Sequence, residues 1–174
     1  MSLATLTNTG RAAIARAIAG RPLHLAWGAG DPAWDAEDAT LPSLVDATAL
    51  TAEVGRRLAT AVGYVEPDEE GDIVIPVATG SGTATNKRYR QVTGPTAYLY
   101  IRVNFNFEDA SSTIIREVGV FMDTVPAQGL PEGQRYFTPG EISDPGLLLA
   151  AEILTPAIAR SPSVRQTVEF VLPI

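Results

Sequence analysis

Two glycine-rich stretches have the composition of phosphate-binding loops. Residues 28–31 read GAGD after a short predicted strand, and residues 80–87 read GSGTATNK. The first lacks the third glycine of a dinucleotide-binding turn, and no helix opens after it. The second lacks the Gly-Lys-Ser/Thr ending that places a lysine on the β- and γ-phosphates. We therefore expect a tight turn at 28–31, using glycine at positive φ, and a flexible loop at 79–87.

Carboxylates gather twice in the sequence, and oxygen-rich clusters can hold Ca²⁺ or Mg²⁺. Neither cluster has the alternating ligand positions and the terminal glutamate of a calcium loop. We therefore interpret both as solvated turns and expect no metal site. The first cluster is Asp31, Asp35, Glu37 and Asp38, and the second is Asp68, Glu69, Glu70 and Asp72.

Nucleophilic catalysis has few residues to draw on. His24 is the only histidine and the chain has no cysteine, so a Ser/His/Asp relay would have to pass through His24, and no GxSxG elbow supplies its serine. His24 lies between Leu23 and Leu25, and we expect it to be a half-exposed residue of a short strand. A carboxylate pair for glycoside hydrolysis stays open, because such partners meet only in the fold. We expect no catalytic residue and no cofactor.

Aromatic side chains are the remaining candidates for recognition. Trp27 and Trp34, seven positions apart across the glycine-rich turn, could stack on each other or fill one end of the core. An exposed tryptophan there would instead indicate an interface anchor. Together with Tyr98 and Tyr100, they are also the surfaces on which a carbohydrate-binding module would stack a sugar.

Composition limits the partners of the chain. Among 174 residues, 13 Lys and Arg face 20 Asp and Glu, for a net charge of −7, so phosphate neutralisation has little to work with and we expect no nucleic-acid partner. The most apolar late run, residues 146–154, is too short to span a bilayer, and the N-terminus lacks the pattern of a leader peptide. We expect one soluble, unsecreted domain over residues 1–174.

The element nearest the N-terminus reads as a short amphipathic helix. Thr7, Asn8 or Thr9 can cap it, Gly20 can end it, and an apolar stripe is formed by Ile14, Ala17 and Ile18. A second helix of one or two turns is expected within residues 44–55.

Most of the remaining sequence alternates with period two, which is typical of strands. The clearest case is 98–107, where Leu99, Ile101, Val103, Phe105 and Phe107 share one face. Polar residues 66–71 suit a hairpin turn between two strands, and residues 123–146, with four prolines, are expected to form a long loop. Further strands are predicted at 57–65, 72–77, 114–122, 147–154 and 166–174. The fold class is therefore α+β and β-dominated: an N-terminal helix packed on a mainly antiparallel sheet or sandwich.

Taken in order, these segments resemble the N-terminal, baseplate-attachment domain of phage tail-fibre proteins. That family shows a helix reading "LTN.G...IA.AI", a strand ending in a Gly-Asp turn, a Thr/Leu-rich segment leading to "E..R", an edge hairpin and a strand reading "REIGLF". The similarity extends over residues 6–121, with a looser echo at 147–174. The matching residues are Leu6, Thr7, Asn8, Gly10, Ile14, Ala15, Ile18, Gly30, Asp31, Leu50, Glu53, Arg56, Arg116, Glu117, Gly119 and Phe121.

The resemblance implies a non-enzymatic structural protein of a phage tail, or of a related contractile device. Its partners would be other tail or baseplate proteins and a tail fibre, with a homo-oligomer or several copies in the virion after synthesis in the host cytoplasm. Two features depart from the family: the chain has no fibrous shaft before Ile174, and it has residues 123–146 where the family has a tight turn. We expect that insertion to contact a neighbouring subunit. A carbohydrate-binding receptor module and a hydrolase remain the alternatives.

Overall fold

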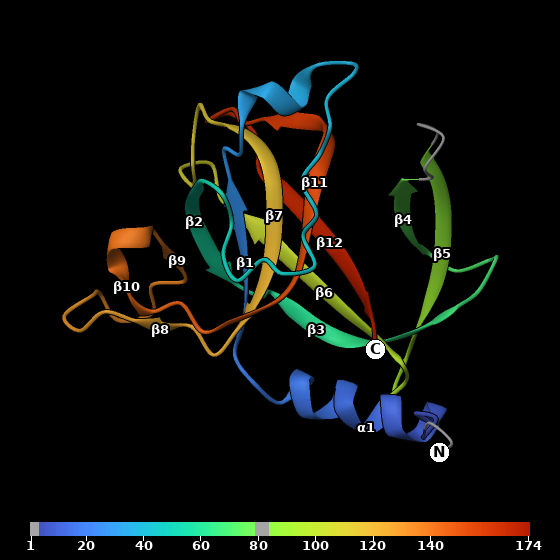
Figure 1. The fold of residues 1–174 in the computed structure, drawn as a ribbon. Helices are drawn as coiled ribbons and strands as arrows, with labels where there is room; N and C mark the ends of the chain where they lie inside the picture. Colours follow the sequence, from blue (N-terminus) through green and yellow to red (C-terminus); the bar gives the residue numbers. More distant parts are fainter. Residues whose placement is uncertain (1–3, 79–83) are drawn as a thin grey trace. The chain divides into compact units, whose positions relative to one another are not determined.

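The computed structural model describes residues 4–78 and 84–174. Strands dominate, and they form two five-stranded sheets and one two-stranded sheet (Figure 1). The chain divides into two compact units. Unit 1 contains Met1–Gly20, Thr60–Arg102 and Val168–Ile174, and unit 2 contains Arg21–Ala59 and Val103–Thr167. The expected class, one N-terminal helix with antiparallel sheets, is confirmed at this level.

Helix α1, Asn8–Ala19, belongs to unit 1. The Thr7 hydroxyl caps it by accepting a hydrogen bond from the Gly10 amide at 3.1 Å, and Gly20 ends it. The predicted apolar stripe is wrong, because Ala15 is the buried residue of α1 while Ile14 is 42% exposed. The helix therefore leaves much of its apolar surface accessible.

The sheet that contains the strands of unit 1 has the order β12-β6-β3-β5-β4. Two local predictions are corrected here. The strand expected at 57–65 is broken by a turn at Ala59 and Thr60, and β3 and β4 do not form a hairpin, since β5 lies between them. Part of the loop expected at 79–87 is the start of β5; the rest, residues 79–83, lies outside the described residues. The bounds are β3 Ala61–Pro67, β4 Ile73–Ala78, β5 Ala84–Val92, β6 Tyr98–Phe105 and β12 Gln166–Pro173.

A small core holds unit 1 together. Val65, Tyr89 and Tyr100 are buried, and Ile73 and Val171 pack against them. The Tyr100 hydroxyl donates to Glu169 at 2.5 Å, while burial and this carboxylate raise the pKa of Tyr100 to about 12. The alternation predicted for 98–107 is confirmed through the end of β6, whereas Phe107 lies beyond the strand and is 40% exposed.

The sheet of unit 2 has the order β11-β7-β1-β2-β9, and its paired neighbours are antiparallel. Strand β7 has the predicted bounds, and β11 extends five residues past its predicted end. The strands are β1 Leu23–Gly28, β2 Glu53–Leu58, β7 Ile114–Met122, β9 Tyr136–Phe137 and β11 Leu147–Ala159.

The core of unit 2 is centred on Trp27. This side chain is fully buried and stacks on Phe105 with ring centroids 3.4 Å apart. The indole N–H donates to the Tyr136 hydroxyl at 3.4 Å, and Gly55 leaves room for that phenol, since a Cβ there would lie 2.2 Å from its oxygen. Of the two arrangements expected for the tryptophans, Trp27 has the one in which it fills the core. Its stacking partner is Phe105 rather than Trp34.

Residues 123–146 form a structured excursion rather than one long loop. Strand β8, Val125–Pro126, pairs with β10, Ile142–Asp144, and a 3₁₀ helix, η2, spans Pro139–Glu141. β9 pairs with β2 and buries Phe137. The expectation of one long loop therefore needs correction, because three short strands within it pair and Phe137 is buried. Residues 128–133 form its largely exposed tip.

The helix predicted within residues 44–55 is wrong. Residues 36–52 contain neither helix nor strand, and β2 begins at Glu53. The preceding turn is a 3₁₀ helix, η1, at Pro32–Asp35. No helix in the described part of the chain is long and apolar enough to cross a membrane.

Candidate functional site

Two adjacent residues of β7 hold the two ends of residues 36–50, which we call the strap. Arg116 is buried and forms an ion pair with Asp35 at 2.8 Å, directly before the strap. It also donates to the Ala29 carbonyl at 2.9 Å. The hydrogen bonds from this guanidinium lower the pKa of Asp35. One arginine thus fixes the glycine turn and η1 to the sheet.

Glu117 holds the other end of the strap. Its two carboxylate oxygens accept hydrogen bonds from the backbone amides of Thr51 at 3.0 Å and Ala52 at 2.7 Å, and its side chain is 2% exposed. Gly28 makes this approach possible, because a Cβ there would lie 2.4 Å from the carboxylate. Consecutive strand residues point to opposite faces, so Arg116 and Glu117 grip the two ends from opposite faces of β7.

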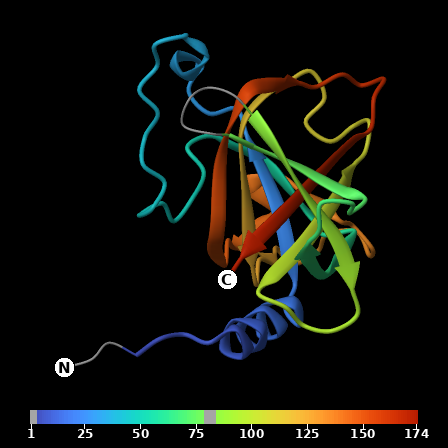
Figure 2. The same ribbon diagram turned by 90° about the vertical axis from the view of Figure 1, so that its right-hand side faces the viewer.

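Between these two anchors, most of the strap is exposed, whereas Ala39, Leu44, Ala47 and Leu50 are partly buried. Leu41 is 44% exposed and Val45 is 89% exposed. Figure 2 shows the segment, in cyan, standing off from the strands of unit 2. Hydrogen bonds within the strap join near neighbours: Ala36 with Ala39, Ser43 with Val45, and Leu44 with Ala47.

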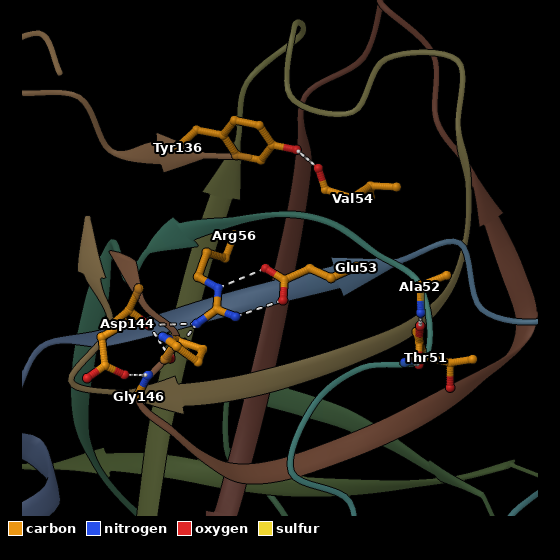
Figure 3. A network of polar contacts seen from close by, with 11 residues as sticks. Thr51, Ala52, Glu53, Val54, Arg56, Tyr136, Asp144 and Gly146 are labelled. Carbon is orange, nitrogen blue, oxygen red and sulfur yellow. Dashed lines mark hydrogen bonds and ion pairs between the residues drawn. The ribbon is translucent and has the colours of Figure 1, made fainter. Parts of the chain in front are cut away.

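A third set of buried contacts, made by Arg56, joins the two ends of residues 123–146, the excursion (Figure 3). Arg56 is 2% exposed and donates to both carboxylate oxygens of Glu53, at 2.8 and 2.7 Å. It also donates to the Thr124 hydroxyl and to the Pro145 carbonyl, each at 2.7 Å, and lies 3.7 Å above the Phe121 ring. Thr124 and Pro145 stand at opposite ends of the excursion, so one guanidinium ties its two ends together.

A similar arrangement holds the turn after β6. Asp109 forms an ion pair with Arg57 at 2.8 Å and accepts from the Asn106 amide at 2.7 Å. Arg160 donates to the Asn106 carbonyl at 2.7 Å and lies 5.0 Å from the Trp27 ring. Buried charge in unit 2 thus anchors the bases of its loops.

Charge is divided unevenly between the units. Unit 1 contains six acidic and six basic residues, whereas unit 2 contains fourteen acidic and seven basic ones, so the net charge of −7 belongs to unit 2. Arg56, Arg116 and Arg160 are buried, and the Arg57 side chain is 13% exposed in its ion pair. The accessible surface of unit 2 is therefore predominantly acidic.

The residues singled out for chemistry have mostly structural roles. Gly30 has φ +57°, as expected of the tight turn. His24 is 3% exposed rather than half exposed, because both faces of β1 are covered. Burial, followed by the charges of Arg56 and Arg135, lowers its pKa to about 4. Within residues 4–78 and 84–174, no group of His, Asp and Glu side chains is arranged to hold a metal ion.

The four aromatic side chains suggested as a stacking surface for a carbohydrate do not form one exposed surface. Trp27 and Tyr100 are buried, and Trp34 is partly buried against Gly30. Tyr98 borders two hollows of unit 1. One, of about 680 Å³, also contains Tyr89 and is bordered by Asp68, Glu69, Asn86, Lys87 and Arg88.

The buried contacts made by Arg116, Glu117 and Arg56, which we call the clamps, give a structural role to residues of the "E..R" and "REVGVF" motifs. Four of the sixteen residues that match the family pattern form these clamps, but their spacing gave no sign of what each one holds. They are Glu53, Arg56, Arg116 and Glu117. Residues 44–50 of the strap were predicted to be part of a helix, although the absence of any basic residue between positions 31 and 55 was a signal of an acidic exposed segment. Arg57 and Arg160 gave no comparable signal, because Asp109 lies about fifty positions from each.

Comparisons with known proteins agree with the resemblance. A search of curated proteins found no match. A family model described as "Baseplate wedge 3 tail fiber network component" matches residues 3–174, nearly the whole chain. The chain therefore belongs to the family of baseplate wedge 3 tail fibre network components.

Proposed function

We propose that this chain is a non-enzymatic structural subunit of a phage or phage-like tail, where it connects the baseplate to the fibre or receptor-binding apparatus. The family's description names both a baseplate wedge and a tail fibre network. In this proposal the chain resides in the virion tail, in several copies, and binds other tail proteins after synthesis in the host cytoplasm.

The observation that carries the proposal is the use of buried charge. Removing one partner of a buried ion pair costs about 3–5 kcal/mol, and the Arg56–Glu53 pair at the root of the excursion is buried on both sides. Arg116 is buried as well, although its partner Asp35 at the start of the strap is 49% exposed. Both arginines thus hold the roots of loops whose outer parts are largely exposed. A loop held at both ends loses less conformational entropy when it docks than a free segment of the same length would, which favours binding. A connector needs such preorganised contact elements.

Cryo-electron microscopy of source particles tests the location. We expect density for the chain at the baseplate, with the tip of the excursion or the strap against another protein. Particles from a strain lacking the gene should have lost or displaced fibres. Normal fibres on particles without this chain would contradict the connector role.

The excursion offers a second test. Replacing Gln128, Leu130, Pro131 and Glu132 by serine alters its tip while keeping β8, β9 and β10. Because these residues lie outside the paired strands, the thermal transition should be unchanged while incorporation into particles falls. Deleting 125–143 should instead destabilise unit 2, since Phe137 is 5% exposed in its core.

A second candidate function is carbohydrate recognition at the Tyr98 hollow. The rings of Tyr89 and Tyr98 lie 5.9 Å apart, and the hollow is bordered by carboxylate, amide and guanidinium groups that could bond sugar hydroxyls. Saturable binding on a glycan array, lost in Tyr98→Ala and kept in Tyr64→Ala, would support it. An array without binding would remove it.

A further inference from the structure

We infer that the strap is a docking segment for a basic surface of another protein, whose apolar centre takes up Leu41 and Val45. This inference deepens the connector proposal and rests on it, because it names the chemistry of one partner surface.

Apolar exposure is the first reason. Val45 is 89% exposed, the highest value among the large apolar side chains in the described ranges, and Leu41 is 44% exposed. A valine or leucine gains about 1.5–3 kcal/mol when it is fully buried. The strap is a largely exposed 15-residue segment with two such side chains four positions apart. Docking would recover most of this energy at Val45 and less than half of it at Leu41.

Charge gives the second reason. Glu37, Asp38 and Asp46 border the two apolar residues on the strap, and the surrounding surface of unit 2 is acidic. A surface rich in Lys and Arg complements this arrangement and speeds association. A second copy of the chain would present the same acidic surface, and like charges would repel it.

The clamps give the third reason. Arg116 and Glu117 fix residues at both ends of the strap to a fully buried part of β7. A segment needed only to join β1 to β2 would not require seventeen residues after η1. Its length and fixed ends suit presentation to a partner.

Reconstitution tests this inference with the full chain. The probe is tail particles purified from a phage strain lacking the gene, to which wild-type or variant protein is added at several salt concentrations. The charge variant is Glu37→Gln/Asp38→Asn/Asp46→Asn, and the apolar variant is Leu41→Ser/Val45→Ser. Matched controls are Glu70→Gln/Asp72→Asn/Glu108→Gln, which changes the net charge equally at three exposed carboxylates outside the strap, and Val164→Ser, which alters another exposed valine (53%).

We expect each strap variant to bind the particles at least about tenfold more weakly, while both controls bind like wild type. The charge variant should also lose most of the salt dependence, because screening acts on its three carboxylates. Carbodiimide cross-linking of wild-type particles should join a strap carboxylate to a lysine of another protein.

Other outcomes separate the two proposals. Wild-type protein that fails to bind the particles would overturn the connector role itself. Wild-type binding with unaffected strap variants, or strap cross-links to a second copy of the chain, would overturn the strap inference and leave the connector role standing.

Discussion

Replacing Arg56 by lysine should test whether the geometry of the guanidinium, rather than its charge, holds the excursion. Arg56 makes four hydrogen bonds, two to Glu53, one to Thr124 and one to Pro145. A lysine ammonium keeps the charge but cannot reproduce the planar fork that meets both oxygens of a carboxylate. The substitution therefore separates bidentate bonding from simple attraction.

The expected loss follows from these contacts. Hydrogen bonds to charged groups contribute about 1.5–3 kcal/mol each, and at least two of the four should be lost. The stacking on Phe121 adds about 1 kcal/mol. Because the ammonium recovers part of this, we expect the free energy of unfolding to fall by about 2–4 kcal/mol.

Urea unfolding followed by tryptophan fluorescence measures this loss in the relevant part of the chain, since Trp27 and Trp34 both belong to unit 2. Arg90→Lys is the matched control: Arg90 pairs with Glu66 at 3.1 Å, but its side chain is 60% exposed. There the change should stay under about 0.5 kcal/mol by circular dichroism. If Arg56→Lys also changed stability by less than this, the clamp reasoning would be refuted.

Three further predictions concern the strap, the turn and pH. Glu117→Gln leaves one carbonyl acceptor for the backbone amides of Thr51 and Ala52, so hydrogen exchange at these two amides should accelerate at least about tenfold. The control Glu132→Gln should leave their exchange unchanged. Equal exchange rates in the two variants would exclude the clamp. Gly30→Ala places a Cβ 2.5 Å from an indole ring at φ +57° and should cost at least about 2 kcal/mol in urea unfolding, whereas Gly140→Ala, with no atom within 4 Å, should cost under about 0.5 kcal/mol. The pKa of His24 is lowered from 6.5 to about 4. The unfolded chain therefore takes up a proton first as pH falls through this window, and stability drops by about 1.4 kcal/mol per pH unit, or about 3 kcal/mol in total. His24→Phe should remove this part of the slope, and an unchanged slope would contradict the burial argument.

Local sequence patterns predicted much of the secondary structure. Thr7 and Gly20 limit α1 because caps act on neighbouring amides, and the alternation in β6 and β7 follows from the two faces of a strand. Strand pairing was less predictable. β3 and β4 are adjacent in sequence, but β5 lies between them, since pairing depends on residues far along the chain.

The properties of the candidate site also divide into those that follow from the sequence and those that depend on long-range contacts. The sequence alone determined that the chain is acidic, β-dominated and similar to tail-fibre attachment domains, because composition, periodicity and motif order are properties of the chain itself. Only the tertiary structure decided that Arg116 and Glu117, neighbours in sequence, hold the two ends of one exposed strap. Each of them reaches a partner more than sixty positions away, and such a pairing exists only once the sheet has brought those segments together.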